Sequence, residues 1–503
     1  MNRKSIMVQG TASSAGKSLA CTAICRILTD DGFNVAPFKS QNMSLNSYIT
    51  SEGHEIGRAQ VMQAEACKKN ADVRMNPILL KPSTNQHSQV VINGIVKEHM
   101  GAREYFKYKP TLKKLVKQSF ESLSVQNDVV VIEGAGSPAE INLKSEDIVN
   151  MGMAKLAKSP VLLIADIDKG GVFASIYGTI MLLDEEERKM IKGIIINKFR
   201  GDVELLKPGL SQIEELVNIP VLGVIPYFNL NLEDEDSATD WSKYDDDSQG
   251  DLDIAIIKLP KISNFTDFNP FKLYKDVNVR FVDLEKDLGN PDLIIIPGTK
   301  STIEDFKLMK TFKMVEKIKA AHKRGSYVFG ICGGYQMLGD KIFDFDNVEC
   351  DIKEVNGLGL LPITTEFKKQ KTTTLTEGED NIFGCKIKGY EIHMGSSKIS
   401  PKATPFANIN RRNNVSLQKG ADGAVNNCQT VYGTYLHGIF DNSLFTRSFL
   451  NKVRISRGKE VVNDKVESYW EHKEKELNKL ADIVRENVDI TSLYKIIEEG
   501  LDD

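Results

Sequence analysis

A single cysteine lies between glycines in the stretch YVFGICGGYQMLG, residues 327–339. The G-x-C-G-G frame around Cys332 is the cysteine counterpart of a nucleophile elbow, a sharp strand-to-helix turn that needs small neighbours and exposes the reactive side chain. A helix N-terminus directly after the thiol would favour the thiolate, which is its nucleophilic form. The pattern therefore predicts a cysteine nucleophile, and a buried thiol that only fills the core is the alternative.

A cysteine nucleophile needs a base, and the stretch GTYLHGIFDN supplies His437 after a short predicted strand. Upstream, DLIIIPGTKS ends another predicted strand in Gly298 and Thr299. Their backbone N–H groups, together with that of Gly333, could form an oxyanion hole, with an ordinary strand-to-loop turn as the alternative. These residue types predict attack on a carbonyl group through a covalent intermediate.

A second set of residues with chemical potential follows the first predicted strand. After SIMVQ the chain reads GTASSAGKS, which differs from the pattern GxxxxGK[ST] in having five residues between its glycines. The backbone N–H groups of such a loop can surround phosphate oxygens at a helix N-terminus, while Lys17 reaches the terminal phosphates and the Ser18 hydroxyl binds Mg²⁺. We therefore predict a nucleotide phosphate site, with a helix-capping turn as the alternative; its remaining loop residues are Gly10, Thr11, Ser14, Ala15 and Gly16.

Two other predicted strand ends add polar side chains to this site. Glu133 follows DVVVI and precedes two glycines, and Asn197 lies in IIINKF. Ligands of open α/β sheets gather at the carboxyl ends of strands, so Glu133 could hold Mg²⁺ and Asn197 could read adenine through its amide. The alternative for Glu133 is a surface acid in a turn, and the alternative for Asn197 is an ordinary capping asparagine.

The elements that must position these residues alternate between short apolar runs and longer helix-compatible stretches. Continuous apolar runs are typical of strands covered on both faces, so residues 1–228 are predicted to form a doubly wound α/β domain. Residues 229–250 are acidic and polar, as in a linker. A second α/β domain is predicted over 251–445, and a charged, helix-compatible extension over 446–503.

Composition narrows the classes of partner. The chain has 65 Lys and Arg against 69 Asp and Glu, which gives a net charge of -4. This balance does not favour binding to nucleic acid or to a membrane surface, so a small-molecule substrate is the remaining prediction. No run reaches the ~18 apolar residues of a membrane span. Seven scattered cysteines do not form a disulfide framework or a zinc pattern, and we expect no structural zinc. These features predict a cytoplasmic protein; its oligomeric state stays open.

The motifs carry a resemblance to known families. FGICGGYQMLG with GTYLHGIF resembles the class I glutamine amidotransferases, and the long phosphate loop resembles that of dethiobiotin synthetase and its relatives. Further segments, such as PFKSQNMSLNSY, EIGRAQVMQAEA, LPKISNFTDFNP and GYEIHMG, make the chain similar to the cobyric acid synthase family over roughly residues 5–445. The resemblance implies a P-loop domain followed by a class I glutamine amidotransferase-like domain.

This resemblance also implies an activity. It predicts ATP- and glutamine-dependent amidation, with Mg²⁺, of the b, d, e and g carboxylates of adenosylcobyrinic acid a,c-diamide, giving adenosylcobyric acid in cobalamin biosynthesis. It further implies that Lys39 and Asn42 lie near the corrinoid substrate and that Asp147 positions substrate or metal, although an N-cap is the alternative for Asp147. Ammonia would need a protected path to the carboxylate.

Two departures from related families leave questions open. The usual triad has Glu two residues after the histidine, where this chain has Ile439, so the group that orients His437 is open. The related cobyrinic acid a,c-diamide synthases have an aspartate-bearing segment where this chain has SQNMSLNS, so the metal ligand that replaces it is also open.

Three other functions remain as alternatives. The nearest is a cobyrinic acid a,c-diamide synthase or another carboxylate amidase of the same branch. A P-loop partitioning or switch ATPase would hydrolyse nucleotide without regard to glutamine. A cysteine hydrolase with a merely structural glycine loop would show no dependence on nucleotide.

Overall fold

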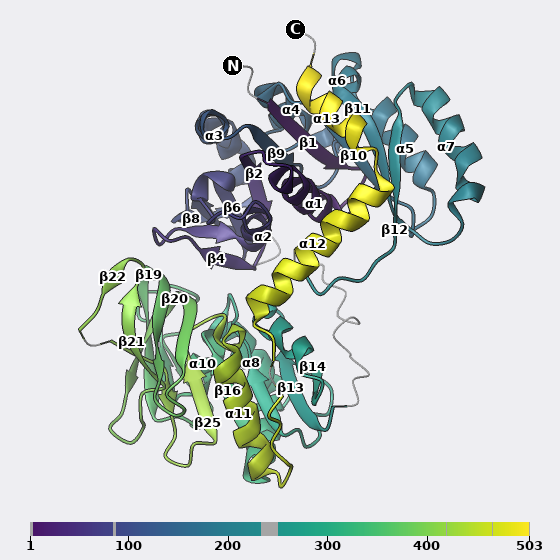
Figure 1. The fold of residues 1–503 in the computed structure, drawn as a ribbon. Coiled ribbons are helices and arrows are strands. Elements are labelled where there is room, and N and C mark those ends of the chain that lie inside the picture. Colours follow the sequence, from purple (N-terminus) through teal and green to yellow (C-terminus); the bar gives the residue numbers. More distant parts are fainter. Residues whose placement is uncertain (1–3, 84–86, 233–249, 419, 465, 502–503) are drawn as a thin grey trace. The chain divides into compact units, whose positions relative to one another are not determined.

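The computed structural model describes residues 4–83, 87–232, 250–418, 420–464 and 466–501. Residues 233–249, most of the predicted acidic linker, lie outside the described residues. The chain divides into two compact units (Figure 1), of which unit 1 comprises Met1–Ser44, Ile56–Ala238 and Lys473–Asp503, and unit 2 comprises Leu45–Glu55 and Thr239–His472.

Unit 1 is built on a parallel sheet. Within the described part of the chain, its six strands lie in the order β12-β11-β10-β1-β9-β2, and every neighbouring pair is parallel. Parallel neighbours need long crossovers, which the helices between the strands supply. The predicted α/β fold class is confirmed for this unit. A smaller sheet adds β3, β6, β7 and β8.

The elements of unit 1 follow in chain order. They are β1 (Lys4–Gly10), α1 (Lys17–Asp30), β2 (Val35–Phe38), β3 (Gln41–Met43), α2 (Arg58–Ala66), η1 (Val73–Met75), β6 (Ile78–Pro82), β7 (His87–Ile92), β8 (Ile95–Gly101), α3 (Ala102–Gln126), β9 (Val129–Glu133), η2 (Ile141–Glu146), α4 (Met151–Ala157), β10 (Val161–Asp166), α5 (Val172–Met181), α6 (Glu185–Met190), β11 (Ile191–Phe199), α7 (Val203–Val217), β12 (Val221–Pro226), α12 (Tyr469–Asn487, in this unit from residue 473) and α13 (Ile490–Glu499).

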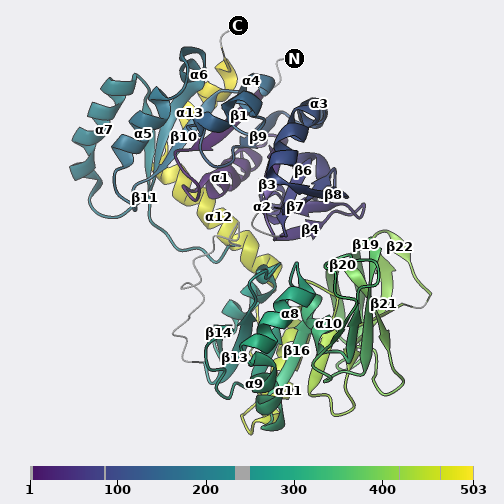
Figure 2. The ribbon, with the colours of Figure 1, turned by 180° about the vertical axis from the view of Figure 1, so that it is seen from behind.

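The C-terminal helices complete the core of unit 1. Leu477, Leu480 and Val484 of α12 belong to the same buried cluster as Ile24 and Leu28 of α1, and Figure 2 shows α12 and α13 beside α1 and the sheet. Apolar residues three and four apart share one helix face, so α12 buries a stripe against α1. The predicted extension 446–503 is thus divided between the units at residue 473.

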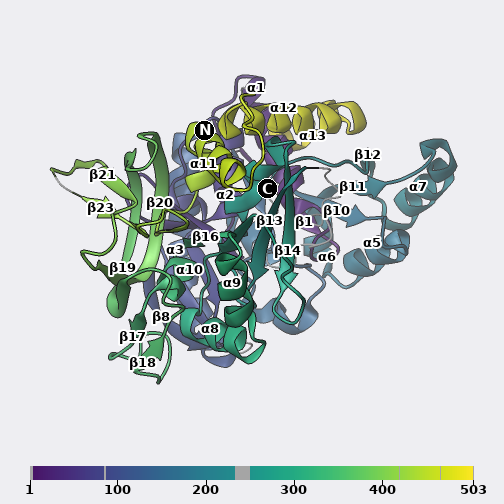
Figure 3. The same cartoon turned by 90° about the horizontal axis from the view of Figure 1, so that it is seen from below.

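Unit 2 contains a second, mostly parallel sheet. In the region that the structure describes, six strands lie in the order β14-β13-β15-β16-β25-β24, and only β24 runs antiparallel to its neighbour. The long strands β19 and β20 run antiparallel side by side in a separate sheet (Figure 3). This unit is α/β as well, so the predicted fold class is confirmed for the second domain.

The elements of unit 2 also follow in chain order. They are β4 (Ser47–Ile49), β5 (Glu55–Gly57, at the division between the units), β13 (Leu252–Lys258), η4 (Phe265–Leu273), β14 (Val277–Asp283), β15 (Leu293–Ile296), α8 (Thr302–Thr311), α9 (Met314–Lys323), β16 (Tyr327–Ile331), α10 (Gly333–Leu338), β17 (Lys341–Phe343), β18 (Glu354–Asn356), β19 (Ile363–Asp380), β20 (Lys386–Ile399), β21 (Ala407–Arg412), β22 (Val415–Ser416), β23 (Ala421–Asp422), β24 (Ala424–Val425), β25 (Val431–Thr434), η5 (Ile439–Asp441) and α11 (Ser443–Ser456).

Residues 45–55, which interrupt the N-terminal half of the sequence, belong to unit 2. The Ser47 N–H donates to Asn264 Oδ1 at 2.8 Å, and Lys371 Nζ forms an ion pair with Glu55 Oε2 at 2.5 Å. The ring of Tyr48 lies edge-on to Tyr390, with centroids 4.7 Å apart. Residues 45–55, although they come early in the sequence, are therefore an integral part of the second unit.

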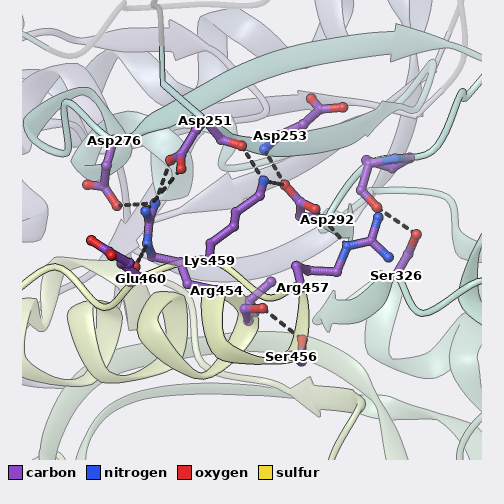
Figure 4. A network of polar contacts seen from close by, with 12 residues as sticks. Asp251, Asp253, Asp276, Asp292, Ser326, Arg454, Ser456, Arg457, Lys459 and Glu460 are labelled. Atoms are coloured by element: carbon purple, nitrogen blue, oxygen red, sulfur yellow. Dashed lines mark hydrogen bonds and ion pairs between the residues drawn. The ribbon is translucent and has the colours of Figure 1, made fainter.

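An ion-pair network fastens α11 and the residues after it to the parallel sheet of unit 2 (Figure 4). The Arg454 guanidinium contacts Asp251 at 2.6 Å and Asp276 at 3.2 Å. Arg457 contacts Asp292 at 2.7 Å, and Lys459 contacts the same carboxylate at 2.5 Å. Because the Arg454 side chain is buried, its charge depends on these carboxylates for compensation.

We expect Arg454→Ala to lower the free energy of unfolding by about 2 kcal/mol, since it removes one partner of a partly buried network and leaves the Asp276 and Asp251 carboxylates without the Arg454 charge. Urea denaturation followed by circular dichroism measures the change. Lys189→Ala serves as the control, because the ion pair of Lys189 with Glu185 is exposed. Equal midpoints for the two variants would contradict a stabilising role for the network.

Candidate active sites

Cys332 occupies a strained turn between β16 and α10. Its backbone angles are φ 50° and ψ -107°, a combination that side-chain-bearing residues rarely adopt. A Cβ at Gly334 would overlap the Ile296 carbonyl oxygen, and one at Gly330 would lie 2.7 Å from the Gly334 carbonyl carbon. The glycines of the G-x-C-G-G frame are therefore required by close packing, and the local geometry is that of the predicted elbow.

His437 contacts a carboxylate that lies far away in the sequence. Its Nδ1 is 2.7 Å from Asp267 Oδ2, while Asp267 Oδ1 accepts the Gly438 N–H at 2.9 Å. Both side chains are buried. A carboxylate on Nδ1 fixes the ring and its tautomer and leaves Nε2 as the other functional nitrogen.

The charges around His437 favour its protonated form. Burial opposes the imidazolium, but the Asp267 carboxylate and the Cys332 thiol group, which hydrogen-bonds to His437, outweigh it and raise the pKa of His437 to about 10. A protonated His437 ring therefore lies beside the Cys332 thiol group. The Cys332 Sγ also lies 3.5 Å from the Ile392 carbonyl oxygen.

Asp267 is the candidate site residue that sequence reasoning missed. It lies in η4, within the segment LPKISNFTDFNP, and thus well before His437 in the sequence. Position 439, where a triad glutamate was sought, holds a fully buried isoleucine. The sequence contained one signal that could have identified it: an aspartate with no assigned role inside a segment that resembles the family.

The predicted oxyanion-hole residues lie together around the elbow. A Cβ at Gly333 would lie 3.2 Å from the Thr299 backbone nitrogen, and one at Gly298 would lie 2.8 Å from His437 Cε1. The Thr299 hydroxyl donates to Asp305 at 2.5 Å, which holds this loop in place. Thr299 and Gly333 therefore pack against each other, and their joint role as an oxyanion hole stays a prediction.

For the glutamine hydrolysis that the sequence predicts, we expect Asp267→Asn to lower kcat by about 100-fold or more, because a neutral amide neither orients nor stabilises the imidazolium equally well. Loss of the carboxylate lowers the pKa of His437, so the alkaline limb of the pH–rate profile should move to lower pH. Glutamate release between pH 6 and 10 measures both effects. An unchanged profile would exclude Asp267 as the orienting group, and ammonium-dependent activity is the control.

The phosphate loop of unit 1 has the curled backbone that its sequence predicts. Ser14 has φ 59° and Gly16 has φ 101°, and a Cβ at Gly16 would overlap the Asn197 amide. Lys17 is buried at the start of α1, and its Nζ donates to the carbonyl oxygens of Ala12 and Gly136, both at 3.0 Å. The ammonium group therefore lies inside the loop.

Two predicted nucleotide contacts have protein partners. The Thr11 N–H donates to the Ile164 carbonyl at 3.0 Å, which extends the strand pairing from Gly10 at the end of β1. Asn197 Nδ2 donates to the Ala15 carbonyl at 2.9 Å. In this arrangement Asn197 braces the phosphate loop, and its role in reading adenine stays a prediction.

Glu133 joins the loop to the predicted substrate lysine. Its Oε1 accepts from the Ser18 hydroxyl and from Lys39 Nζ, both at 2.7 Å, and all three side chains are buried. A buried carboxylate needs such compensation. The structure thus brings together Ser18, Glu133 and Lys39, which lie in three separate segments of the sequence.

The other two predicted substrate residues differ in their surroundings. Asn42 is buried, and its Nδ2 lies 3.3 Å from Gln60 Oε1. Asp147 accepts the backbone N–H groups of Val149, Asn150 and Gly152 at 2.7, 2.9 and 2.8 Å. Gly152 lies in the first turn of α4, whose N-cap residue is Asn150, so Asp147 stabilises the turn that leads into this helix without being its N-cap. A contact of Asp147 with substrate or metal stays a prediction.

Comparison with known proteins now assigns the family. Residues 6–238 match the CobQ/CobB/MinD/ParA nucleotide binding domain, and residues 253–445 match the CobB/CobQ-like glutamine amidotransferase domain. The chain is 59% identical over 503 residues to a cobyric acid synthase of Clostridium novyi (strain NT), covering 100% of this chain and 99% of that one. The chain belongs to the cobyric acid synthase family. Its predicted family is thereby confirmed.

Other members of the cobyric acid synthase family are similarly close. A relative from Alkaliphilus metalliredigens is 50% identical, covering 98% of this chain and 99% of its own, and one from Caldanaerobacter subterraneus is 52% identical, covering 99% of each. The predicted class of enzyme, a glutamine amidotransferase joined to a nucleotide-binding domain, is also confirmed.

The described residues contain neither a membrane-spanning helix nor a cluster of metal-binding side chains. No helix there is both long and apolar enough to cross a membrane. No group of three or more His, Cys, Asp or Glu side chains in the described ranges could hold a metal ion.

Proposed function

We propose that this member of the cobyric acid synthase family uses ATP and glutamine to convert the b, d, e and g carboxylates of adenosylcobyrinic acid a,c-diamide to amides. The observation that carries the proposal is the arrangement of Cys332, His437 and Asp267 in the same chain as a phosphate loop ending in Lys17 and Ser18. One site is equipped to release ammonia and the other to bind a nucleotide.

Glutamine cleavage follows from the groups in unit 2. The Cys332 thiolate attacks the side-chain amide carbon of glutamine, and the backbone N–H groups of Thr299 and Gly333 stabilise the tetrahedral oxyanion. The His437 imidazolium, held by Asp267, donates its proton to the leaving nitrogen. Water then hydrolyses the thioester and releases glutamate.

Carboxylate activation is assigned to unit 1. Lys17 would stabilise charge on the phosphoryl group that moves from ATP to a corrinoid carboxylate, and ammonia would displace phosphate from the resulting mixed anhydride. The Ser18 hydroxyl and the Glu133 carboxylate are oxygen donors of the kind that magnesium prefers, so these residues fit a nucleotide-bound ion. When bound, magnesium neutralises phosphate charge.

Mass spectrometry of the corrinoid tests the proposal. The full chain is incubated with adenosylcobyrinic acid a,c-diamide, ATP, magnesium chloride and glutamine, and the mass of the corrinoid counts the carboxyl groups converted to amides. We expect four conversions and none when ATP is omitted. An unchanged a,c-diamide, or amidation only of cobyrinic acid at two positions, would contradict the proposed substrate.

A further inference from the structure

Two glutamines on helix α2 direct their amide nitrogens at the carboxylate of Glu133. Gln63 Nε2 lies 2.5 Å from Glu133 Oε2, and Gln60 Nε2 lies 3.5 Å from the same oxygen. Both side chains are fully buried. They are three residues apart and so lie on one face of the helix.

The amide oxygens of these two glutamines differ in their surroundings. Gln60 Oε1 accepts from Asn42 Nδ2 at 3.3 Å. Gln63 Oε1 is buried and has no hydrogen-bond partner among the residues that the structure describes. A buried acceptor without a donor is destabilising, and native proteins contain few of them. A ligand that binds the Gln63 amide oxygen would remove this cost.

The neighbourhood of Gln63 suits a hard cation. Its amide nitrogen donates to Glu133, the carboxylate that also accepts from the Ser18 hydroxyl. The amide oxygen is attached to the same carbon as that nitrogen, so it lies close to the Glu133 carboxylate. Magnesium takes six oxygen ligands in octahedral geometry and accepts neutral oxygens as well as carboxylates. The Ser18 hydroxyl and the Gln63 amide would supply neutral oxygens beside the Glu133 carboxylate.

We propose that Gln63 gives its side-chain amide oxygen to the magnesium ion that Ser18 and Glu133 hold beside the nucleotide. The inference rests on the proposed use of ATP and magnesium by unit 1. The Gln63 Nε2 then keeps its bond to Glu133 Oε2, while the buried Oε1, which has no donor among the described residues, binds the cation. One residue can thus donate to the Glu133 carboxylate through its amide nitrogen and bind the cation through its amide oxygen.

Metal affinity, measured without turnover, tests the assignment. The full chain is titrated with Mn²⁺ in the presence of a non-hydrolysable ATP analogue, and free Mn²⁺ is followed by electron paramagnetic resonance. We expect Gln63→Met to weaken Mn²⁺ binding about tenfold or more, as loss of a group that supports a metal commonly does. Gln63→Glu, which keeps an oxygen but loses the donor, should bind Mn²⁺ at least as tightly as the unaltered chain.

Gln60→Met is the matched control, because Gln60 lies on the same helix and faces the same carboxylate, but its oxygen is already bonded to Asn42. It should change Mn²⁺ affinity less than threefold. Unchanged affinity in Gln63→Met, or equal weakening in Gln63→Met and Gln63→Glu, would overturn the assignment and leave the proposed function standing. Failure of the unaltered chain to bind Mn²⁺ with the nucleotide analogue would overturn both.

Discussion

Replacing Cys332 with alanine is expected to lower glutamine-dependent amidation at least ~1000-fold, the scale on which loss of a covalent nucleophile acts. The reason is chemical, because the strained turn at Cys332 presents one thiol beside His437 and the oxyanion donors, and an alanine there leaves no atom to form the thioester. Corrinoid mass, measured with glutamine as the nitrogen source, gives the rate.

The same Cys332→Ala variant should retain amidation with a high concentration of ammonium chloride, within a few-fold of the unaltered chain. Free ammonia replaces the product of unit 2, so only the activation chemistry of unit 1 is then needed. A variant that uses glutamine at the normal rate would show that Cys332 is not the nucleophile. A variant that also loses ammonium-dependent activity would show that the substitution damages more than glutamine cleavage.

Lys17→Ala is expected to lower amidation ~100- to 1000-fold with either nitrogen source, the usual cost of removing one preorganised group that stabilises transition-state charge. The Lys17 ammonium lies inside the phosphate loop between the carbonyls of Ala12 and Gly136, and alanine leaves no cation at that position. Initial rates with ammonium chloride isolate this effect from glutamine cleavage.

Alkylation of Cys332 by iodoacetamide provides the control for Lys17→Ala, because an unchanged alkylation rate shows that the thiol site of unit 2 is intact. If Lys17→Ala amidates with ammonium at more than a tenth of the normal rate, Lys17 does not stabilise the transferred phosphoryl group. The two variants together therefore separate the two chemical steps, since only the cysteine variant is rescued by ammonium.

Local patterns in the sequence were sufficient to predict the two sharp turns, which are the phosphate loop and the turn at Cys332. The spacing of Gly16, Lys17 and Ser18 predicts a loop that curls around phosphate, and the glycines beside Cys332 predict an elbow. Both depend on backbone conformations that only a few residue types tolerate, so the sequence records them over short stretches. The alternation of apolar runs and helix-compatible stretches likewise predicted the α/β class.

Contacts between distant segments could not be predicted in this way. Asp267 reaches His437 because η4 packs beside the loop that carries the histidine, and no periodicity or spacing connects the two positions. The contact between Lys39 and Glu133 depends on the pairing of β2 with β9. The sequence could not decide whether Asp147 caps a helix or binds a ligand, since an acid before a helix has the same sequence pattern in both cases.

The membership of residues 45–55 in unit 2 and of residues 473–503 in unit 1 has a consequence for how this enzyme can be divided. The polypeptide passes between the two units four times, so no single cut yields two complete folding units. A fragment that begins after residue 238 lacks Tyr48 beside Tyr390 and the Ser47 bond to Asn264. Splitting the gene into two subunits would therefore require rearranging the order of its segments as well as breaking it.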